Sequence, residues 1–317
     1  MPTIGVCSAD NGSSDGRTVR IRHCLQLPSL DCVVDRILAM RDMESESYHY
    51  LHYCGRPCKA DTPPIVLVST WREQVCEWAY DVVDHFKLSR ETVAVCMSLL
   101  DRFLAVKSQQ SHFREHELSS SFVLLSVMAC LQLAAKINEP RRFRLEQFCH
   151  LSNARFSPHQ VEESECNILS TLDWKVNPPT ALEFVGLILL LLPLESEWGG
   201  VIGEVYQAAR FIIELSICDE YFVPVDASRV AMASIIIATE DVPATSDLLS
   251  TQTKVQFLKT ISELIHMHSN DPQIKAACLK LKNIYWDNVV SQKIKEEEEH
   301  IIIARDSPTS VVDGAIK

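Results

Sequence analysis

Hydrophobic residues recur along most of this chain at the spacing of amphipathic helices. Trp71, Val75, Trp78, Val82 and Phe86, for example, follow one another at steps of three or four residues. Because an α-helix turns once every ~3.6 residues, such positions share one face and can be buried together. In the first half of the chain the pattern predicts helices near residues 31–50, 70–86, 90–104, 118–136, 145–149 and 158–172.

A second series of helical patterns follows the break at Pro178 and Pro179. It predicts helices near residues 181–192, 201–218, 226–239, 253–266 and 274–289. The central members of the two series, 126–135 and 228–238, are alike in combining small and apolar residues, as close helix packing requires. We therefore predict an all-α protein built from tandem five-helix repeats, preceded by an N-terminal helix and flanked by disordered termini.

Composition shifts divide the chain into five parts. Polar and small residues without any period predict a disordered N-terminal tail, and a run of four glutamates predicts an acidic, disordered regulatory tail at the other end. The predicted parts are the N-terminal tail 1–29, the N-terminal helix and linker 30–68, the first repeat 69–176, the second repeat 177–289 and the C-terminal tail 290–317.

Net charge and the length of apolar runs exclude some classes of binding partner. The net charge is −12, and a nucleic-acid surface needs clustered Lys and Arg, so we expect no nucleic-acid partner. The apolar run 186–192 is too short for a bilayer and ends at Pro193, so we expect no membrane partner. No signal peptide opens the sequence, and its 12 cysteines are expected to be reduced. Cys130, Cys166 and Cys218 lie among apolar neighbours and are predicted to be small core residues.

Motifs for catalysis are missing from the sequence. It contains no Gly-rich phosphate loop, no His-Glu-x-x-His and no Gly-x-Ser-x-Gly, so we expect neither an enzyme nor a cofactor. One metal site stays open as an alternative: His49, His52, Cys54 and Cys58 could ligate zinc. A plain loop is the simpler interpretation, because Tyr, Arg and Pro interrupt the run and no second Cys/His pair follows.

Four short motifs, in order and in register, resemble a cyclin box. They are Trp71-Arg-Glu-Gln-Val-Cys-Glu-Trp78, Leu99-Leu-Asp-Arg-Phe-Leu-Ala105, Leu133-Ala-Ala-Lys-Ile-Asn-Glu139 and Glu165 followed by Leu172-Asp-Trp174. The resemblance continues through the second repeat and covers roughly residues 30–289. It implies a regulatory subunit that binds and activates a cyclin-dependent serine/threonine kinase during cell-cycle progression. The alternative is a cyclin-fold transcription regulator, acting with a transcriptional kinase or on DNA.

Two further segments resemble the D-type, G1-class cyclins. They are Asp35-Arg-Ile-Leu-Ala-Met40 and Ser307-Pro-Thr-Ser-Val311, the latter placed after an acidic run. This resemblance implies control of the G1/S transition, residence in nucleus and cytoplasm, phosphorylation of Ser307, and recognition of the tail by a ubiquitin ligase. The retinoblastoma-docking motif of that class, Leu-x-Cys-x-Glu, is met here at Leu30 and Cys32 but has Val34 in place of Glu.

The resemblance also assigns a kinase-binding surface. Lys136 would donate hydrogen bonds to the kinase backbone and Glu165 would accept one. The two residues could therefore bind both the C=O and the N–H groups of a main chain. Ile137, Leu169 and Trp174 would surround them with apolar contact. Taken alone, Lys136 reads as a solvated helix end and Glu165 as an ordinary surface residue.

Two other residue sets follow from the family resemblance. Arg72 and Asp101 would form a buried, structural ion pair between neighbouring helices. Trp71, Val75 and Trp78 lie where the family docks substrate or inhibitor peptides. Because Gln74, Ser120 and Leu124 depart from the family's docking pattern, these three residues are equally well read as core.

Overall fold

The chain is helical wherever its structure is described. A computed structural model covers residues 1–317 and describes residues 28–48, 67–109, 120–140, 144–151, 155–192, 201–247 and 249–305. Within these ranges there are helices and turns but no strand. The helices are α1 Leu30–Ser47, α2 Leu67–His85, α3 Glu91–Gln109, α4 Ser120–Asn138, α5 Leu145–Leu151, α6 Pro158–Thr171, α7 Ala181–Leu189, α8 Ile202–Cys218, α9 Ala227–Glu240, α10 Pro243–Ser246, α11 Thr251–Ile265 and α12 Pro272–Arg305. The predicted all-α fold class is confirmed.

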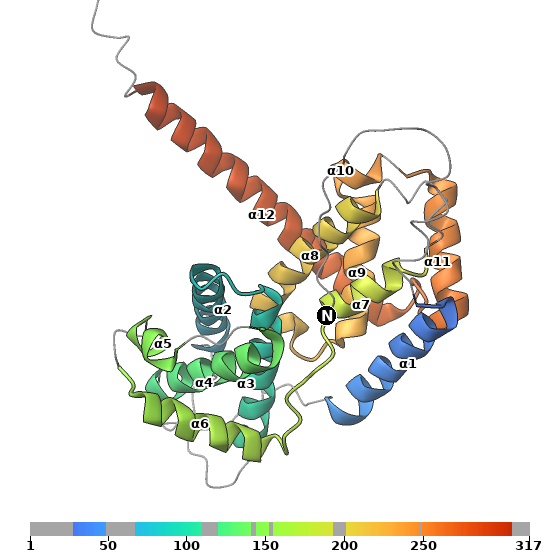
Figure 1. Ribbon diagram of the computed structural model, residues 1–317. Helices are drawn as coiled ribbons and strands as arrows, with labels where there is room; N and C mark the ends of the chain where they lie inside the picture. The colour runs from blue at the N-terminus through green and yellow to red at the C-terminus, as the bar shows by residue number, and fades with distance from the viewer. Residues whose placement is uncertain are drawn as a thin grey trace, which may run out of the picture.

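The first repeat is organised around α4, which packs against α3 and α6 (Figure 1). Met128 and Leu131 on this helix are fully buried. The window Ser121–Asn138 is long and apolar enough to cross a membrane by composition, and 61% of it is buried inside the protein. A helix at the centre of a bundle has neighbours on every side, which accounts for its apolarity all round.

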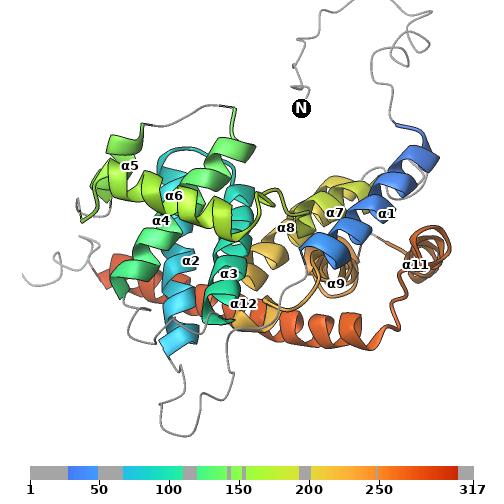
Figure 2. The same ribbon diagram turned by 90° about the horizontal axis from the view of Figure 1, so that it is seen from below.

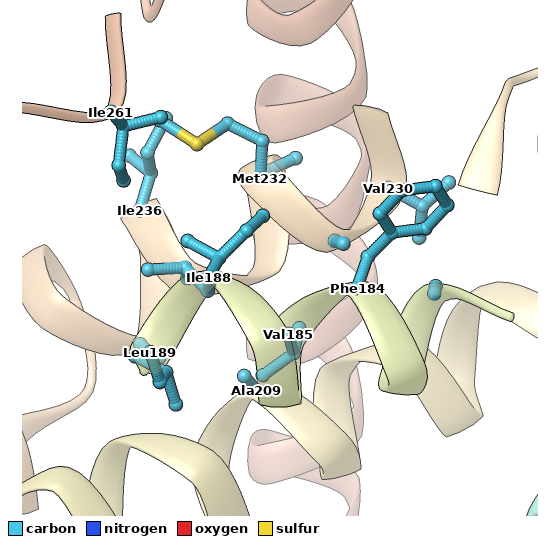
Figure 3. Close-up of a cluster of buried hydrophobic side chains, with 14 of the residues drawn as sticks. Phe184, Val185, Ile188, Leu189, Ala209, Val230, Met232, Ile236 and Ile261 are labelled. Carbon is cyan, nitrogen blue, oxygen red and sulfur yellow. The ribbon is translucent and has the colours of Figure 1, made fainter. Parts of the chain in front are cut away.

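The second repeat is organised around α9 in the same way. Side chains from α7, α8, α9 and α11 meet in one buried cluster (Figure 3). Its labelled members are Phe184, Val185, Ile188, Leu189, Ala209, Val230, Met232, Ile236 and Ile261. Because small residues such as Ala209 lie on α8 beside the bulky side chains of α7, these helices approach closely.

The N-terminal helix α1 packs on the second repeat, beside α7 and α11 (Figure 2). Arg36 Nη2 lies 2.5 Å from Glu183 Oε1, and this ion pair joins α1 to α7. Near the end of α1, the carboxylate of Glu44 accepts from the backbone N–H of Ser228 at 3.0 Å and from its hydroxyl at 2.6 Å. Glu44 is buried, and burial raises its pKa against the opposing hydrogen bonds from Ser228.

The sequence sets the start of α6 by local chemistry. Pro158 occupies the first turn, as predicted. Proline lacks an N–H, but N–H groups in the first turn have no acceptor within the helix, so no helical hydrogen bond is lost. The hydroxyl of Ser157 accepts from the N–H of Gln160 at 3.3 Å. In return, the side chain of Gln160 accepts from the N–H of Ser157 at 2.9 Å, which completes a capping box.

The structure differs from the sequence-based prediction at the C-terminal end. The tail 290–317 was predicted to be disordered, but α12 continues to Arg305 and extends past the other helices in Figure 1. Glu and Lys are good helix formers, and extending an existing helix avoids the cost of nucleation, so a charged run can prolong α12. Residues 306–317, with Ser307, lie outside the described residues, as do residues 1–27 and the candidate zinc ligands His49, His52, Cys54 and Cys58.

Candidate protein-binding site

Lys136 and Glu165, predicted as separate contacts for a partner, are joined to each other. Lys136 lies in the last turn of α4 and Glu165 lies in the middle of α6. Lys136 Nζ is 2.5 Å from Glu165 Oε2, with the Lys136 side chain 40% exposed and that of Glu165 only 8% exposed. Glu165 is therefore not an ordinary surface residue, whereas Lys136 presents part of its side chain to solvent.

The carboxylate of Glu165 has acceptor capacity to spare. Burial raises its pKa, and the hydrogen bond and positive charge of Lys136 act in the opposite direction. Its Oε1 atom is buried and has no hydrogen-bond partner among the described residues. Because buried polar atoms are nearly always paired, this oxygen marks a place where a partner's N–H would be favourable.

Apolar side chains are exposed close to this pair along the chain. Ile137, next to Lys136, is 37% exposed, and Trp174, just beyond the end of α6, is 71% exposed. Leu169 lies one turn after Glu165 and is partly buried against the core of the first repeat. Exposed large apolar side chains are typical of protein-binding surfaces.

The backbone holds Trp174 in an uncommon conformation. Asp173 has φ 50° and Trp174 has φ 60°, both in the left-handed region. The turn is closed by the N–H of Trp174, which donates to the carbonyl oxygen of Leu169 at 3.0 Å. A bulky residue in this region carries steric strain, and such strain is often kept where a side chain has a function. Here the turn ends α6 and leaves the indole in solvent.

Arg72 and Asp101 come together as the family resemblance implied. A guanidinium nitrogen of Arg72 donates to the carboxylate of Asp101, and the side chains of both residues are almost fully buried. Arg72 also donates to the main-chain oxygen of Ile217, in α8, at 3.0 Å. The pair borders a cavity of about 150 Å³ at the junction of the two repeats. The Arg72–Asp101 ion pair therefore has a structural role, because it joins α2 to α3 and, through Ile217, to the second repeat.

The three residues predicted for peptide docking are packed against the first core. Val75 is buried, and Trp71 and Trp78 are partly buried against the same cluster. The ring of Trp78 lies 6.2 Å from that of Phe148, between centroids. This placement agrees with the alternative left open by the sequence, in which the three residues belong to the core.

The cysteines were interpreted correctly only in part. Cys130 is buried as predicted, and Cys218 is partly buried against the core of the first repeat. Cys166 is exposed, so apolar neighbours in sequence did not imply burial for this residue. Cys218 lies beside Cys76, a contact that no sequence pattern signalled because 142 positions separate them. Among the described residues, no cluster of three or more His, Cys, Asp or Glu could hold a metal ion.

Comparison with known families matches both repeats. Residues 34–177 match the cyclin N-terminal domain, and residues 179–295 match the cyclin C-terminal domain. The chain therefore belongs to the cyclin family.

Relatives among characterised proteins are cyclins of several types. The chain is 25% identical over 199 residues to the G2/mitotic-specific cyclin-B of Marthasterias glacialis, covering 62% of this chain and 47% of that one. It is 26% identical over 175 residues to the S-phase entry cyclin-6 of Saccharomyces cerevisiae, covering 55% of this chain and 42% of that one. The chain thus spans less than half the length of these two curated relatives.

A solved structure supports the fold. The X-ray structure of a viral cyclin from herpesvirus saimiri aligns with a TM-score of 0.57 and 14% sequence identity, covering 80% of this chain and 96% of that chain. At this identity the similarity concerns the arrangement of the helices alone.

Proposed function

We propose that this cyclin is the regulatory subunit that binds and activates a cyclin-dependent serine/threonine kinase. The observation that carries the proposal is the site on α4 and α6, where a half-exposed ammonium lies against a buried carboxylate with one unpaired oxygen. Ile137, next to Lys136 in the sequence, and Trp174, just past the end of α6, are exposed apolar side chains on the same two helices or their ends. Such a surface suits a partner that offers both main-chain polar groups and apolar side chains.

The site would act by holding a kinase helix in its active position. A protein kinase transfers phosphate only when a Glu of its helix C pairs with a strand Lys, so a surface that packs behind this helix promotes activity. Lys136 would donate to a main-chain carbonyl of the kinase, because an ammonium has three donors and Glu165 takes only one. Glu165 Oε1 would accept from a main-chain N–H.

In the folded chain, Glu165 Oε1 is already buried and the side chain is already restricted, so desolvation and side-chain ordering both contribute less to the free-energy cost of binding a partner. Because Oε1 is already buried in the free chain, a hydrogen bond from a partner to this atom removes little further hydration. The two residues also hold each other in place, because the bond between them restricts both side chains. An acceptor prepared in this way favours binding without a large loss of side-chain freedom.

We further propose that this protein is a D-type cyclin acting at the G1/S transition, in nucleus and cytoplasm. The support is the segment Asp35–Met40 in α1, together with the acidic run and Ser307-Pro308 near the C-terminus. The two relatives described above are mitotic and S-phase cyclins, so the assignment of phase rests on these motifs. Phosphorylation of Ser307 would mark the chain for a ubiquitin ligase.

The proposal is tested by isolating the protein from cells and measuring protein-kinase activity in the purified fraction. Mass spectrometry of that fraction identifies the kinase, and reconstitution with it measures activation directly. A protein that purifies without kinase activity, and that fails to raise the activity of any cyclin-dependent kinase tested, would refute the proposal.

A further inference from the structure

Helices α2 and α8 form a contact between the two repeats that is fixed by hydrogen bonds at both ends. Arg72 Nη2 donates to the main-chain oxygen of Ile217 at 3.0 Å. Two turns further along α2, the hydroxyl of Tyr80 lies 3.4 Å from the main-chain oxygen of Glu214 and donates to it. Because both acceptors belong to the backbone of α8, these bonds set the register of the two helices.

A third side chain strengthens the end of this contact at Tyr80. The guanidinium of Arg90 lies 4.3 Å from the centre of the Tyr80 ring. Its Nε donates to Glu214 Oε2 at 2.8 Å, so the same arginine reaches both helices. The position midway between Arg72 and Tyr80 on α2 is therefore held between two anchored turns.

Cys76 occupies that midway position on α2, and it lies against Cys218, the last residue of α8, one position after Ile217. Their Sγ atoms lie 3.0 Å apart, although the residues are 142 positions apart in sequence. A disulfide bond is about 2.0 Å long, so the two sulfurs would need to approach by about 1 Å. Because the hydrogen bonds of Arg72 and Tyr80 hold α2 against α8, the two thiols stay within reach of each other.

We propose that Cys76 and Cys218 form a reversible disulfide that clamps the two repeats together when the protein meets a peroxide. The two thiols differ in access, which gives each a separate role. Cys218 is partly exposed and can be reached by a small oxidant, whereas Cys76 is fully buried behind it. The inference rests on the contact between α2 and α8 and does not require a kinase or any other partner.

The surroundings favour the thiolate on Cys218. The hydrogen bond with Cys76 lowers the pKa of Cys218, and the positive charge of Arg72 acts in the same direction. Burial and the carboxylates of Glu73 and Glu77 oppose this shift. The pKa of Cys76 is raised, first by its hydrogen bond with Cys218 and then by burial. Since the thiolate is the nucleophile and Cys218 is the more exposed of the two thiols, Cys218 is the residue that reacts first.

The chemistry balances with hydrogen peroxide as the oxidant. The thiolate of Cys218 attacks one peroxide oxygen, the O–O bond breaks, and a sulfenic acid forms with release of hydroxide. Cys76 then attacks the sulfenic sulfur and gives up its proton. The S–S bond forms, the S–O bond breaks, and the second oxygen leaves as water. Two thiols and one peroxide thus give one disulfide and two waters, and an external dithiol reverses the bond by exchange.

A bond at this place would change stability more than shape. It would close a loop of 142 residues across both repeats, which restricts the unfolded chain strongly. The expected rise in melting temperature is roughly 5–10 °C for a chain of this size. The oxidised protein should also resist separation of the two repeats, because their relative position would be fixed covalently.

The experiment treats the fully reduced, full-length protein with hydrogen peroxide and then alkylates the remaining thiols under denaturing conditions. Peptide mapping by mass spectrometry is expected to find the Cys76 and Cys218 peptides linked to each other, at a mass lower by two hydrogen atoms. The melting temperature should rise, and dithiothreitol should reverse both changes. Cys166→Ser, which removes an exposed thiol away from this contact, should behave as the wild type does.

Two variants make the result decisive. Cys218→Ser and Cys218→Ala should fold in the reduced state, because this side chain is partly exposed, and should lose both the linked peptide and the rise in melting temperature. Any of three results would overturn the proposal. They are alkylation of both Cys76 and Cys218 after peroxide treatment, overoxidation of Cys218 with Cys76 still free, and linkage of Cys218 to another cysteine or another chain.

Discussion

Lys136 and Glu165 are bonded to each other in the isolated chain, with Nζ 2.5 Å from Oε2, while Glu165 Oε1 stays buried without a partner among the described residues. The pair therefore differs from an exposed salt bridge, whose two charges are both hydrated. The ammonium satisfies one carboxylate oxygen and leaves the other unpaired. A partner that supplies one N–H to Oε1 would complete the hydrogen bonding of the site without separating the pair.

Removing both charges should abolish kinase binding and leave folding intact. In Lys136→Ala combined with Glu165→Ala, neither charge is left buried alone, so the loss of stability should be small. The measurement is co-purification of kinase activity with the tagged variant, alongside its melting curve. The matched control replaces Lys259 and Glu263 by Ala, because they form an exposed ion pair in the second repeat. Kinase recovery at the wild-type level by the Lys136/Glu165 variant would refute the assignment.

Burial of Glu165 should make stability depend on pH. Its pKa is raised above 4.5 in the folded chain, so the folded state holds this proton more tightly than the unfolded state does. The contribution is therefore fully present below about pH 4.5 and is lost as the pH rises through the folded pKa. Glu44 has the same sign of shift and adds to the trend.

Two substitutions separate the contribution of Glu165 from that of Glu44. Glu165→Gln should flatten the pH profile of the unfolding free energy, because no charge then forms at this position. Lys136→Ala should steepen it, because the group that lowers the pKa of Glu165 is gone. Urea unfolding at a series of pH values between 4 and 7 measures both effects. Identical profiles for Glu165→Gln and the wild type would contradict the role of burial.

Loss of Arg72 should destabilise the protein severely. Arg72→Ala leaves the Asp101 carboxylate buried without its cation and removes the bond to Ile217, so the expected loss is ~3–5 kcal/mol. Glu73→Ala, at the exposed neighbouring position, is the matched control and should change little. Chemical denaturation provides the measurement. An unchanged melting temperature for Arg72→Ala would contradict a stabilising pair.

Phosphorylation of Ser307 should shorten the life of the protein in cells. A phosphate adds about −1.5 to −2 charges to a segment that follows an acidic run, which favours recognition by another protein over docking onto this one. We expect Ser307→Ala to have a longer half-life than the wild type in a synthesis-block experiment. Equal half-lives, with phosphorylation of the wild type verified, would show that the tail has no part in turnover.

The sequence predicted those features of the fold that depend on local periodicity. The apolar pattern of α4 identified a central helix, because burial on all sides requires apolar residues on all sides. Pro158 placed the start of α6 for an equally local reason. The pairing of Arg72 with Asp101 came from resemblance to a family, since their separation along the chain carries no periodic signal.

Features that depend on packing between distant segments could not be predicted. The contact of Cys76 with Cys218 exists because α2 and α8 meet across the junction of the repeats, and neither helix encodes that meeting alone. The bond between Lys136 and Glu165 likewise needs α4 and α6 side by side. The family resemblance predicted that both residues contact a kinase. Only the structure shows that they are also bonded to each other.

Substitutions in the strained turn after α6 should distinguish the effect of Trp174 on stability from its effect on kinase binding. Trp174 has φ 60° and is 71% exposed, so Trp174→Gly relieves the backbone while removing little buried surface. We expect the unfolding free energy to stay equal or rise by up to about 1 kcal/mol, while kinase binding is lost. Asp173→Gly is the matched control, because it relieves the adjacent residue at φ 50° and leaves the indole in place, so it should still bind. Calorimetric titration with the purified kinase and urea unfolding measure the two quantities. Full binding by Trp174→Gly would show that the exposed indole is no part of the kinase-binding surface.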